Sequence, residues 1–241
     1  MKHTLPNSAL YWLPRIEKAG LPVPQTEIVP FSTEGVYPIF DGERSDEFDR
    51  LVEAVRVAAE RIGKPVFVRT DQTSAKHGGP SHYLITDNES VGDVLANTIA
   101  DHELKLMFGP YAEAILVRQF LKLRHSFCAF GGLPISREFR FFANARQVIC
   151  IHPYWPEEAM VFYGGEPTGW REQLAAMHRI PDEIEGLKDL AMRAAGACGD
   201  SDWSVDFCQD ENGDWWLLDM ALAGCSWHWP ACPFGQHNEH K

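Results

Sequence analysis

Asp206 and Asp219 are the residues of this chain whose types and spacing most directly suggest chemistry. Between them stands Asn212-Gly213, a dipeptide typical of two-residue hairpin turns, because such turns need positive φ at both positions. A hairpin closed by this turn pairs Cys208 with Leu217 and places Asp206 opposite Asp219. Like charges directly opposite each other destabilise a sheet. The sequence therefore predicts a positive group between the carboxylates, and a hard cation held by their oxygens is the simplest choice.

The apolar residues of the same hairpin agree with this register, because side chains alternate between the two faces of a strand. Val205, Phe207, Leu218 and Met220 then share one apolar face. Two other interpretations of the aspartates stay open. They could be solvated surface carboxylates, or the acid and base of a hydrolase such as a glycosidase.

A second group of candidate residues is Arg137, Glu138 and Arg140, in a segment otherwise rich in phenylalanine. In a strand, Arg137 points to one face, and Glu138 and Arg140 point to the other. Arginine binds phosphate or carboxylate through its planar fork, so an anion is predicted near these side chains. The alternative is an internal ion pair with Glu138 or another acid.

A third group follows a predicted strand at 65–69 and consists of Arg69, Lys76, Gly78 and Gly79. A glycine-bearing loop of this kind can place backbone N–H groups and a lysine against phosphates. The loop is not a P-loop, because it has no Gly-x-x-x-x-Gly-Lys-Ser/Thr run. An ordinary solvated turn is the alternative interpretation.

The C-terminal tail holds side chains that could ligate zinc by type, namely Cys225, His228, Cys232, His237 and His240. Their spacing matches no common zinc pattern, and the Trp and Pro residues among them favour a packed cap instead. Serine hydrolases and dinucleotide-binding proteins are not indicated, since the chain has neither Gly-x-Ser-x-Gly nor Gly-x-Gly-x-x-Gly.

These groups need elements to position them, and hydrophobic periodicity predicts such elements. Helices are predicted at 8–20, from Ser45 to Ile62, from Ser90 to Ile99, and at about 168–179 and 182–197. Strands are predicted at 65–69 and 114–121, and as a hairpin of 137–143 with 147–151. Residues 31–44 are predicted to form a loop. Antiparallel hairpins with separate helices predict an α+β fold.

The chain has 241 residues, 45% of them hydrophobic, and a net charge of -12. This charge argues against non-specific nucleic-acid binding through phosphates. No apolar run approaches the length of about 20 residues that spans a membrane. The N-terminus shows no signal-peptide pattern. The six cysteines show no paired spacing, so a reduced, cytoplasmic location is expected.

Taken in order, these motifs resemble the ATP-grasp superfamily, most closely its branch of cell-division-cycle protein 123 and related small phage and bacterial proteins. The resemblance covers about residues 60–228 and rests on Val66–Thr70 with its loop, Ile115–Leu121, Arg137–Arg140 and the aspartate hairpin. It implies an α+β fold of two lobes with antiparallel sheets, flanking helices and a nucleotide cleft between them. The implied ranges are an N-terminal segment at 1–60, a small nucleotide-binding lobe at 61–113, and a large lobe with the metal-binding hairpin at 114–241.

The resemblance also implies roles for individual residues. Asp206 and Asp219 would hold Mg²⁺. Arg137, Arg140 and Lys76 would act in catalysis by meeting the triphosphate or acyl-phosphate oxygens. ATP would be bound by the same two arginines together with Arg69, Lys76, Gly78, Arg118, and the backbone around Gln119 and Leu121.

The implied function is an ATP- and Mg²⁺-dependent ligase that activates a carboxylate as an acyl phosphate for attack by an amine or similar nucleophile. The alternative is a non-catalytic ATP-binding assembly factor of the cell-division-cycle protein 123 type. Two positions depart from the family pattern: Arg69 stands where lysine is usual, and Ala221 stands where an asparagine is expected. The second partner is expected to be a carboxylate or a protein or peptide substrate, which the sequence does not identify.

Overall fold

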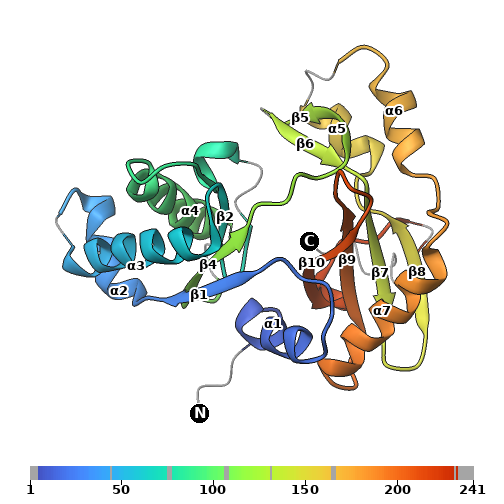
Figure 1. Ribbon diagram of the computed structural model, residues 1–241, viewed down its shortest axis with the longest axis horizontal. Helices are drawn as coiled ribbons and strands as arrows, with labels where there is room; N and C mark the ends of the chain where they lie inside the picture. The colour runs from blue at the N-terminus through green and yellow to red at the C-terminus, as the bar shows by residue number, and fades with distance from the viewer. Residues whose placement is uncertain are drawn as a thin grey trace. The chain divides into compact units, whose positions relative to one another are not determined.

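The computed structural model describes residues 5–43, 45–74, 78–105, 109–130, 132–163, 167–230 and 232. The chain divides into two compact units, whose elements are labelled in Figure 1. The larger unit consists of Met1–Val23, Lys122–Ala129 and Pro134–Lys241, and the smaller unit of Pro24–Leu121 and Phe130–Leu133.

These units differ from the division expected at residues 60 and 113, and two strands show why. Strand β1 (Thr26–Pro30) comes from the expected N-terminal segment, and β4 (Ala114–Gln119) comes from the expected large lobe. The two strands pair with each other, so both belong to the smaller unit. Pairing between strands so distant in sequence leaves no local signal from which a boundary could be drawn.

The smaller unit is built on a four-stranded antiparallel sheet in the order β1-β4-β2-β3, with β2 at Val66–Thr70 and β3 at Leu84–Ile85. Its helical segments are α2 (Thr33–Val36), η1 (Tyr37–Asp41), α3 (Asp46–Ile62), η3 (Pro80–His82) and α4 (Val91–Lys105). Alternate residues of the central strands, including Val66, Val68 and Val117, share one buried core with α3 and α4. The unit is therefore a sheet whose helices cover one face.

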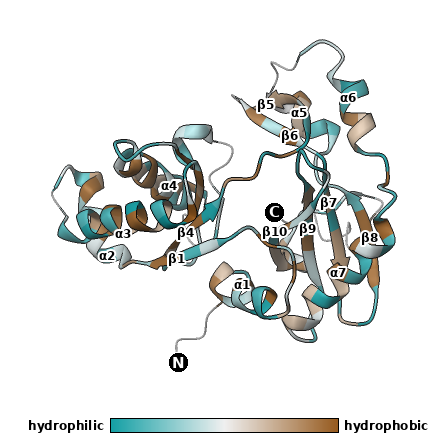
Figure 2. Cartoon of the chain, in the orientation of Figure 1, coloured by the Kyte–Doolittle hydropathy of each residue, from teal (hydrophilic) through white to brown (hydrophobic). Residues whose placement is uncertain are grey.

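Helix α3 illustrates how the sequence specifies an element. Ser45 caps it by accepting a hydrogen bond from the N–H of Phe48 at 3.0 Å, as its residue type predicts. Acidic residues occupy the first turn, where they suit the helix dipole. Leu51 and Val55 are buried, and Figure 2 shows hydrophobic and hydrophilic residues alternating along the helix. Gly63, with φ of 95°, ends it.

The larger unit contains a four-stranded antiparallel sheet in the order β10-β9-β7-β8 and a separate hairpin of β5 and β6. The strands are β5 (His125–Ala129), β6 (Leu133–Ser136), β7 (Glu138–Ala143), β8 (Val148–Pro153), β9 (Trp203–Gln209) and β10 (Trp215–Leu222). The helical segments are α1 (Ala9–Lys18), α5 (Glu157–Tyr163), α6 (Trp170–Met177), α7 (Ile184–Ala197) and η4 (Ala223–Cys225). Helix α7 contacts β7, β8 and β9 (Figure 1).

The two faces of the larger sheet differ in chemistry. One face, here called the phenylalanine face, carries Phe139, Phe207 and Leu217, which lie opposite one another along the register and are fully buried. Leu217 takes the position on this face that the sequence predicts for Leu218. The other face carries Arg140, Asp206 and Asp219 and is here called the carboxylate face.

Several predictions about elements are confirmed and others are wrong. The predicted hairpin of 137–143 with 147–151 is present as β7 and β8. The predicted loop at 31–44 instead contains α2 and η1, because Ser32 caps a short helix by accepting a hydrogen bond from Gly35. The hairpin of β5 and β6 and helix α5 have no counterpart in the predictions. The six cysteines form no disulfide.

Within the described parts of the chain, the helices are all too short or too polar to cross a membrane.

Candidate functional site

The hairpin of β9 and β10 does not close with the predicted two-residue turn. Its pairing ends at Gln209 and Trp215, which leaves a five-residue loop. The side chain of Asp210 organises this loop, because its Oδ1 accepts hydrogen bonds from the N–H groups of Asn212 and Asp214, each at 2.9 Å. Aspartate side chains commonly organise loops in this way, by accepting hydrogen bonds from backbone N–H groups a few residues later in the chain.

The register beyond this loop nevertheless brings the two predicted aspartates together. Near the loop the pairing differs by one residue from the prediction, and Cys208 pairs with Trp216. An irregularity at Leu218 then shifts the register by one residue, so that Asp206 stands directly opposite Asp219. The predicted opposition is confirmed, and the predicted turn is wrong, because the bulge compensates for the longer loop.

The positive group that the two carboxylates require is, for Asp206, the guanidinium of Arg140. Arg140 lies opposite Asp206 on the neighbouring strand β7. Its Nε and Nη2 donate to Oδ1 and Oδ2 of Asp206, both at 2.7 Å. The side chains are 13% and 6% exposed. The predicted alternative of an internal ion pair is therefore confirmed for Arg140, with Asp206 rather than Glu138 as its partner.

Further contacts hold the Arg140 guanidinium in place. Its Nη1 donates to the carbonyl oxygen of Trp227 at 3.2 Å, and its centre lies 4.7 Å from the ring centroid of Tyr154. Burial alone would lower the pKa of Arg140, but the charge and hydrogen bonds of Asp206 outweigh burial and raise it. The fork is thus fixed on the carboxylate face in its charged form.

The side-chain oxygens that this face offers to a hard cation come from Asp219 and Asp206. Asp219 is half-buried, and its Oδ1 accepts a hydrogen bond from the N–H of Met220 at 3.0 Å. Asp206 offers carboxylate oxygens that already accept from Arg140. Ala221, opposite Ser204, supplies no side-chain oxygen. Among the described residues, no three His, Cys, Asp or Glu side chains gather as a ready ligand group.

The described residues of the tail form a packed cap, the arrangement that the sequence favours over a zinc site. The ring of His228 stacks on Phe142 with centroids 4.1 Å apart, and its Nε2 donates to the carbonyl oxygen of Ala223 at 2.8 Å. Trp229 donates from Nε1 to the carbonyl oxygen of Pro153 at 2.9 Å. Cys225 is exposed, and Cys232 is buried beside His228. His237 and His240 lie outside the described residues.

Burial in this cap also changes the titration of a neighbouring imidazole. His152, on β8, is surrounded by Trp227 and Trp229, whose ring centroids lie 6.0 and 5.8 Å away. Burial is the largest cause and lowers the pKa of His152 to about 4; a backbone hydrogen bond at Pro153 opposes the shift, and the charge of Arg140 adds to it. His152 is therefore neutral at physiological pH and adds no charge to the carboxylate face.

In the smaller unit, two of the predicted ATP-binding residues share one face of the sheet. Arg118 lies opposite Phe67, and Arg69 lies opposite Leu116, so the two arginines occupy alternate positions on the same face. Both are almost fully buried, at 3% exposure for Arg69 and 4% for Arg118. This face is the one opposite the core shared with α3 and α4.

The remaining predicted nucleotide contacts of this unit are only partly described. Lys76 lies outside the described residues, and Gly78 lies just after that gap. The N–H of Gln119 donates to the carbonyl oxygen of Gln25 at 2.8 Å, so this one of the backbone groups predicted to bind ATP already has a partner. Leu121 follows β4 in an irregular segment.

A buried histidine that sequence reasoning missed anchors the loop after β2. His102 Nδ1 lies 3.1 Å from the hydroxyl oxygen of Thr70, and its Nε2 lies 3.2 Å from the carbonyl oxygen of Pro110. Because the carbonyl can only accept, Nε2 carries the proton and Nδ1 accepts. Nearby, Lys105 donates to the carbonyl oxygen of Ser74 at 3.1 Å. Helix α4 therefore holds the start of the glycine-bearing loop, by contacts that no local pattern indicates.

Arg137 lies on the opposite side of the larger sheet from Arg140. Its N–H and C=O continue the ladder of β7, and its side chain contacts Gln209 and Trp215 on the phenylalanine face. The resemblance implies that both arginines meet triphosphate or acyl-phosphate oxygens, but their side chains leave opposite faces of the sheet. This separation follows from the alternation of side chains along a strand.

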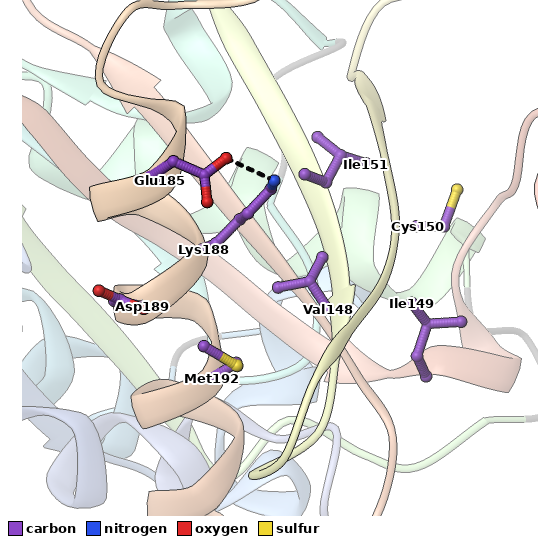
Figure 3. A pocket seen from close by; sticks show the side chains of 8 residues that line it. All are labelled: Val148, Ile149, Cys150, Ile151, Glu185, Lys188, Asp189 and Met192. Carbon is purple, nitrogen blue, oxygen red and sulfur yellow. Dashed lines mark hydrogen bonds and ion pairs between the residues drawn. The ribbon is translucent and has the colours of Figure 1, made fainter.

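A hollow of about 360 Å³ lies along the edge strand β8, in a different place from all of these residues. It is lined by Val148–Ile151 and by Glu185, Lys188, Asp189 and Met192 of α7 (Figure 3). Lys188 is engaged by Glu185 at 2.7 Å. None of the predicted site residues that the structure describes lines this hollow, which lies at the edge of the sheet.

Comparisons with known proteins address the fold. No protein-family model matches the chain, and no curated protein matches it. Among solved structures, C-terminally truncated Cdc123 from Schizosaccharomyces pombe superposes with a TM-score of 0.55 at 13% identity, covering 90% of this chain and 83% of that chain. The ADP complex of the N5-carboxyaminoimidazole ribonucleotide synthetase purK gives 0.54 at 15% identity, covering 96% and 50%.

A third structure, the biotin carboxylase domain of the Hydrogenobacter thermophilus 2-oxoglutarate carboxylase with MgADP, gives a TM-score of 0.53 at 14% identity, covering 90% of this chain and 40% of that chain. The chain spans about half the length of several of the structures it matches. At these identities the likeness concerns the fold alone. Together with the antiparallel sheets and their helices, it shows that the chain has the ATP-grasp fold and that Cdc123 is among the proteins it resembles.

Proposed function

We propose that the chain binds ATP with Mg²⁺ and uses it to activate a carboxylate. The observation that carries the proposal is the direct opposition of Asp206 and Asp219 on one sheet face, with the Arg140 fork beside them. Carboxylate oxygens are the donors that Mg²⁺ prefers, and a fixed guanidinium suits a phosphate oxygen. The ADP-bound and MgADP-bound structures with the same fold support this reading.

In this proposal Asp219 is the principal metal ligand, and Asp206 has two tasks. Asp206 holds the Arg140 fork through both oxygens. Because it lies on the same face of the sheet as Asp219, it would also be the second ligand to the metal. When bound, Mg²⁺ would neutralise charge on the phosphate oxygens and polarise the phosphorus toward attack. Arg140 would hold a phosphate oxygen at a fixed position and stabilise the charge that develops there.

The proposed reaction has two steps with ordinary atom balance. A carboxylate oxygen of the substrate attacks the γ-phosphorus, the bond from phosphorus to the β–γ bridging oxygen breaks, and ADP leaves. An amine or similar nucleophile then attacks the acyl carbon, the bond from that carbon to the phosphate oxygen breaks, inorganic phosphate departs, and the proton lost by the nucleophile passes to solvent. The chain's own contribution is positioning and charge neutralisation rather than covalent chemistry.

We also propose that Arg69 and Arg118 of the smaller unit contact phosphates of ATP, together with Lys76 and Gly78. This part of the proposal is supported by the position of the two buried arginines on one face of the sheet. Arg69→Lys restores the residue usual in the family and is expected to retain ATP binding, whereas Arg69→Met is expected to weaken it. Equal ATP affinity of these two variants and the wild type would contradict this part of the proposal.

The central test uses Asp219, because replacing Asp206 would also disturb Arg140. Calorimetric titration of Asp219→Asn with Mg-ATP is expected to show an affinity at least about tenfold lower than wild type, or about 1.4 kcal/mol. ATP with EDTA should bind the variant and the wild type alike, because no metal is then involved. Asp214→Asn, an exposed aspartate of the same hairpin, is the matched control. Wild-type affinity of Asp219→Asn for Mg-ATP, with unchanged metal dependence, would overturn the proposal.

A second candidate function is ATP binding without ligation, in an assembly factor. The observation that favours it is Ala221, which stands opposite Ser204 and leaves the face with fewer oxygen ligands. The likeness to Cdc123 over most of both chains supports it further. Release of ADP, measured with and without pools of amino acids and peptides, separates the two functions. Tight Mg-ATP binding with no ADP under any condition would favour the assembly factor.

The proposal also places the chain in the cytoplasm, where ATP is supplied and thiols stay reduced. The absence of disulfides among its six cysteines supports this location.

A further inference from the structure

Three residues from distant segments of the larger unit are tied together by a closed ring of backbone hydrogen bonds. The N–H of Arg124 donates to the carbonyl oxygen of Gln209 at 2.8 Å, and the N–H of Gln209 donates to that of Arg137 at 3.0 Å. The N–H of Arg137 donates back to the carbonyl oxygen of Arg124 at 2.9 Å. The backbone therefore fixes the starting points of three polar side chains relative to one another.

The side chains of the same three residues also converge. Oε1 of Gln209 accepts a hydrogen bond from Nη1 of Arg124 at 3.1 Å and another from Nη1 of Arg137 at 3.3 Å. Gln209 is buried, at 4% exposure, and its Nε2 donates to the carbonyl oxygen of Gly213 at 3.0 Å. One neutral, immobilised amide thus holds two guanidinium groups side by side.

The positive charge gathered here is not neutralised by a direct partner. Within the described part of the chain, neither Arg124 nor Arg137 forms an ion pair, in contrast to Arg140. Nε of Arg137 is buried and has no hydrogen-bond acceptor among the described residues. Burial and then the charge of Arg124 lower the pKa of Arg137. Two like charges held close by a neutral group indicate a place kept for an external anion.

We propose that Arg124 and Arg137, spaced by Gln209 and bordered by the ring of Trp215, bind a carboxylate group. Arg124 is exposed and Arg137 is partly exposed, so both side chains are accessible to a ligand. Nη2 of Arg137 also donates to the carbonyl oxygen of Arg179 at 3.1 Å. Trp215, whose ring centroid lies 5.8 Å from the Arg137 guanidinium, offers a flat apolar surface beside the charge. Planar guanidinium forks match the planar carboxylate in geometry.

A carboxylate group fits this site better than a phosphate group. The charges of Asp182 and Glu183 act on Arg137 from nearby. These acids would repel the charge that a phosphate concentrates on one group more strongly than the single negative charge of one carboxylate group. The site lies on the phenylalanine side of the sheet, opposite Asp206 and Asp219, so it is independent of the proposed metal and nucleotide contacts.

The test uses succinate as the probe and succinamide as its uncharged match. In ¹⁵N-detected titrations of the full chain, succinate is expected to shift the Nε–Hε resonance of Arg137 in a saturable manner, and succinamide is not. Arg124→Lys and Arg137→Lys keep the charge but lose the fork, and each is expected to raise the Kd for succinate about tenfold or more. Arg146→Lys, at an exposed turn, is the matched control and should bind succinate like wild type. Circular dichroism confirms that each variant is folded.

Each outcome decides the proposal. Saturable binding of succinate that both lysine variants weaken supports it. Absence of any shift with succinate, or equal shifts with succinate and succinamide, overturns it. Tighter binding of inorganic phosphate than of succinate would also overturn the assignment to a carboxylate. Asp219→Asn should leave succinate binding unchanged, so failure of this site and failure of the proposed function are told apart.

Discussion

Arg137 and Arg140 stand three residues apart in one segment and occupy opposite electrostatic settings. Arg140 is paired through two bonds with Asp206 on the carboxylate face. Arg137 is held by two neutral acceptors, Gln209 and the carbonyl oxygen of Arg179, on the other face. The difference shows that one strand can place two arginines in unlike settings. The charge of Arg140 is balanced by Asp206, which fixes its orientation, whereas Arg137 has no carboxylate partner among the described residues.

The largest effect is expected from removing the partner of Arg140. Asp206→Ala leaves a buried guanidinium without its carboxylate and is expected to lower the free energy of unfolding by about 3–5 kcal/mol. Arg137→Ala removes hydrogen bonds to neutral groups and is expected to lower it by about 1–2 kcal/mol. Urea denaturation of both variants measures the contrast. Equal losses in the two variants would remove the distinction between the faces.

A smaller effect is expected when each arginine keeps its charge but loses its fork. Arg140→Lys can no longer donate two parallel hydrogen bonds to Asp206, so it is expected to lose about 1–3 kcal/mol of unfolding free energy. Arg137→Lys is expected to lose less than about 1 kcal/mol, because its acceptors do not require a fork. Thermal unfolding followed by circular dichroism tests the order, which the comparison requires to be Arg140 before Arg137.

Gln209→Glu would give Arg137 the kind of partner that Arg140 has. A carboxylate at this position would neutralise both guanidiniums from inside the protein, so the Kd for succinate is expected to rise about tenfold. The titration described for the wild type provides the measurement, and Gln147→Glu, on the exposed turn before β8, provides the control. Unchanged succinate affinity in Gln209→Glu would show that the charge of the two arginines is not what attracts the anion.

A small effect is expected at Asp210, a carboxylate held by N–H groups instead of by a cation. Burial raises its pKa, but hydrogen bonds from the Trp216 indole and from the N–H groups of Asp214 and Asn212 outweigh burial and lower it. A lowered folded-state pKa means that the stabilisation is complete above the unfolded value of about 3.9 and is lost as pH falls through the folded value. Asp210→Asn should therefore lower stability by about 1 kcal/mol at pH 7.

The same substitution should make little difference once the wild-type carboxyl is protonated. Urea midpoints of wild type and Asp210→Asn at pH 7 and in strongly acidic buffer provide the check. A gap that stays constant or widens toward low pH would mean that the ionised carboxylate does not organise the loop.

The opposition of Asp206 and Asp219 could be predicted from the sequence because strand periodicity constrains which residues share a face. The turn could not, because nothing local distinguishes a two-residue turn at Asn212-Gly213 from a longer loop organised by Asp210. The separation of Arg137 from Arg140 follows from the same alternation. These predictions depend on neighbours along one strand, and such neighbours are visible in the sequence.

The contacts that give the two arginines their different settings could not be predicted. Gln209 and Arg124 are 85 residues apart, and Arg140 and Asp206 are 66 residues apart. The sequence allows an internal ion pair for Arg140 but does not say which acid forms it. The anchoring of the glycine-bearing loop by His102 is hidden for the same reason, since a lone histidine in a helix carries no pattern.

The bulge at Leu218 has a consequence for how the length of this hairpin can change. Because the register shifts by one residue there, the paired segments on either side of it are set independently. Deleting Leu218 would join Leu217, opposite Phe207, directly to Asp219, opposite Asp206, as consecutive residues of a regular strand. Deletion of Leu218 is therefore expected to leave Asp206 opposite Asp219 and to remove only the bulge.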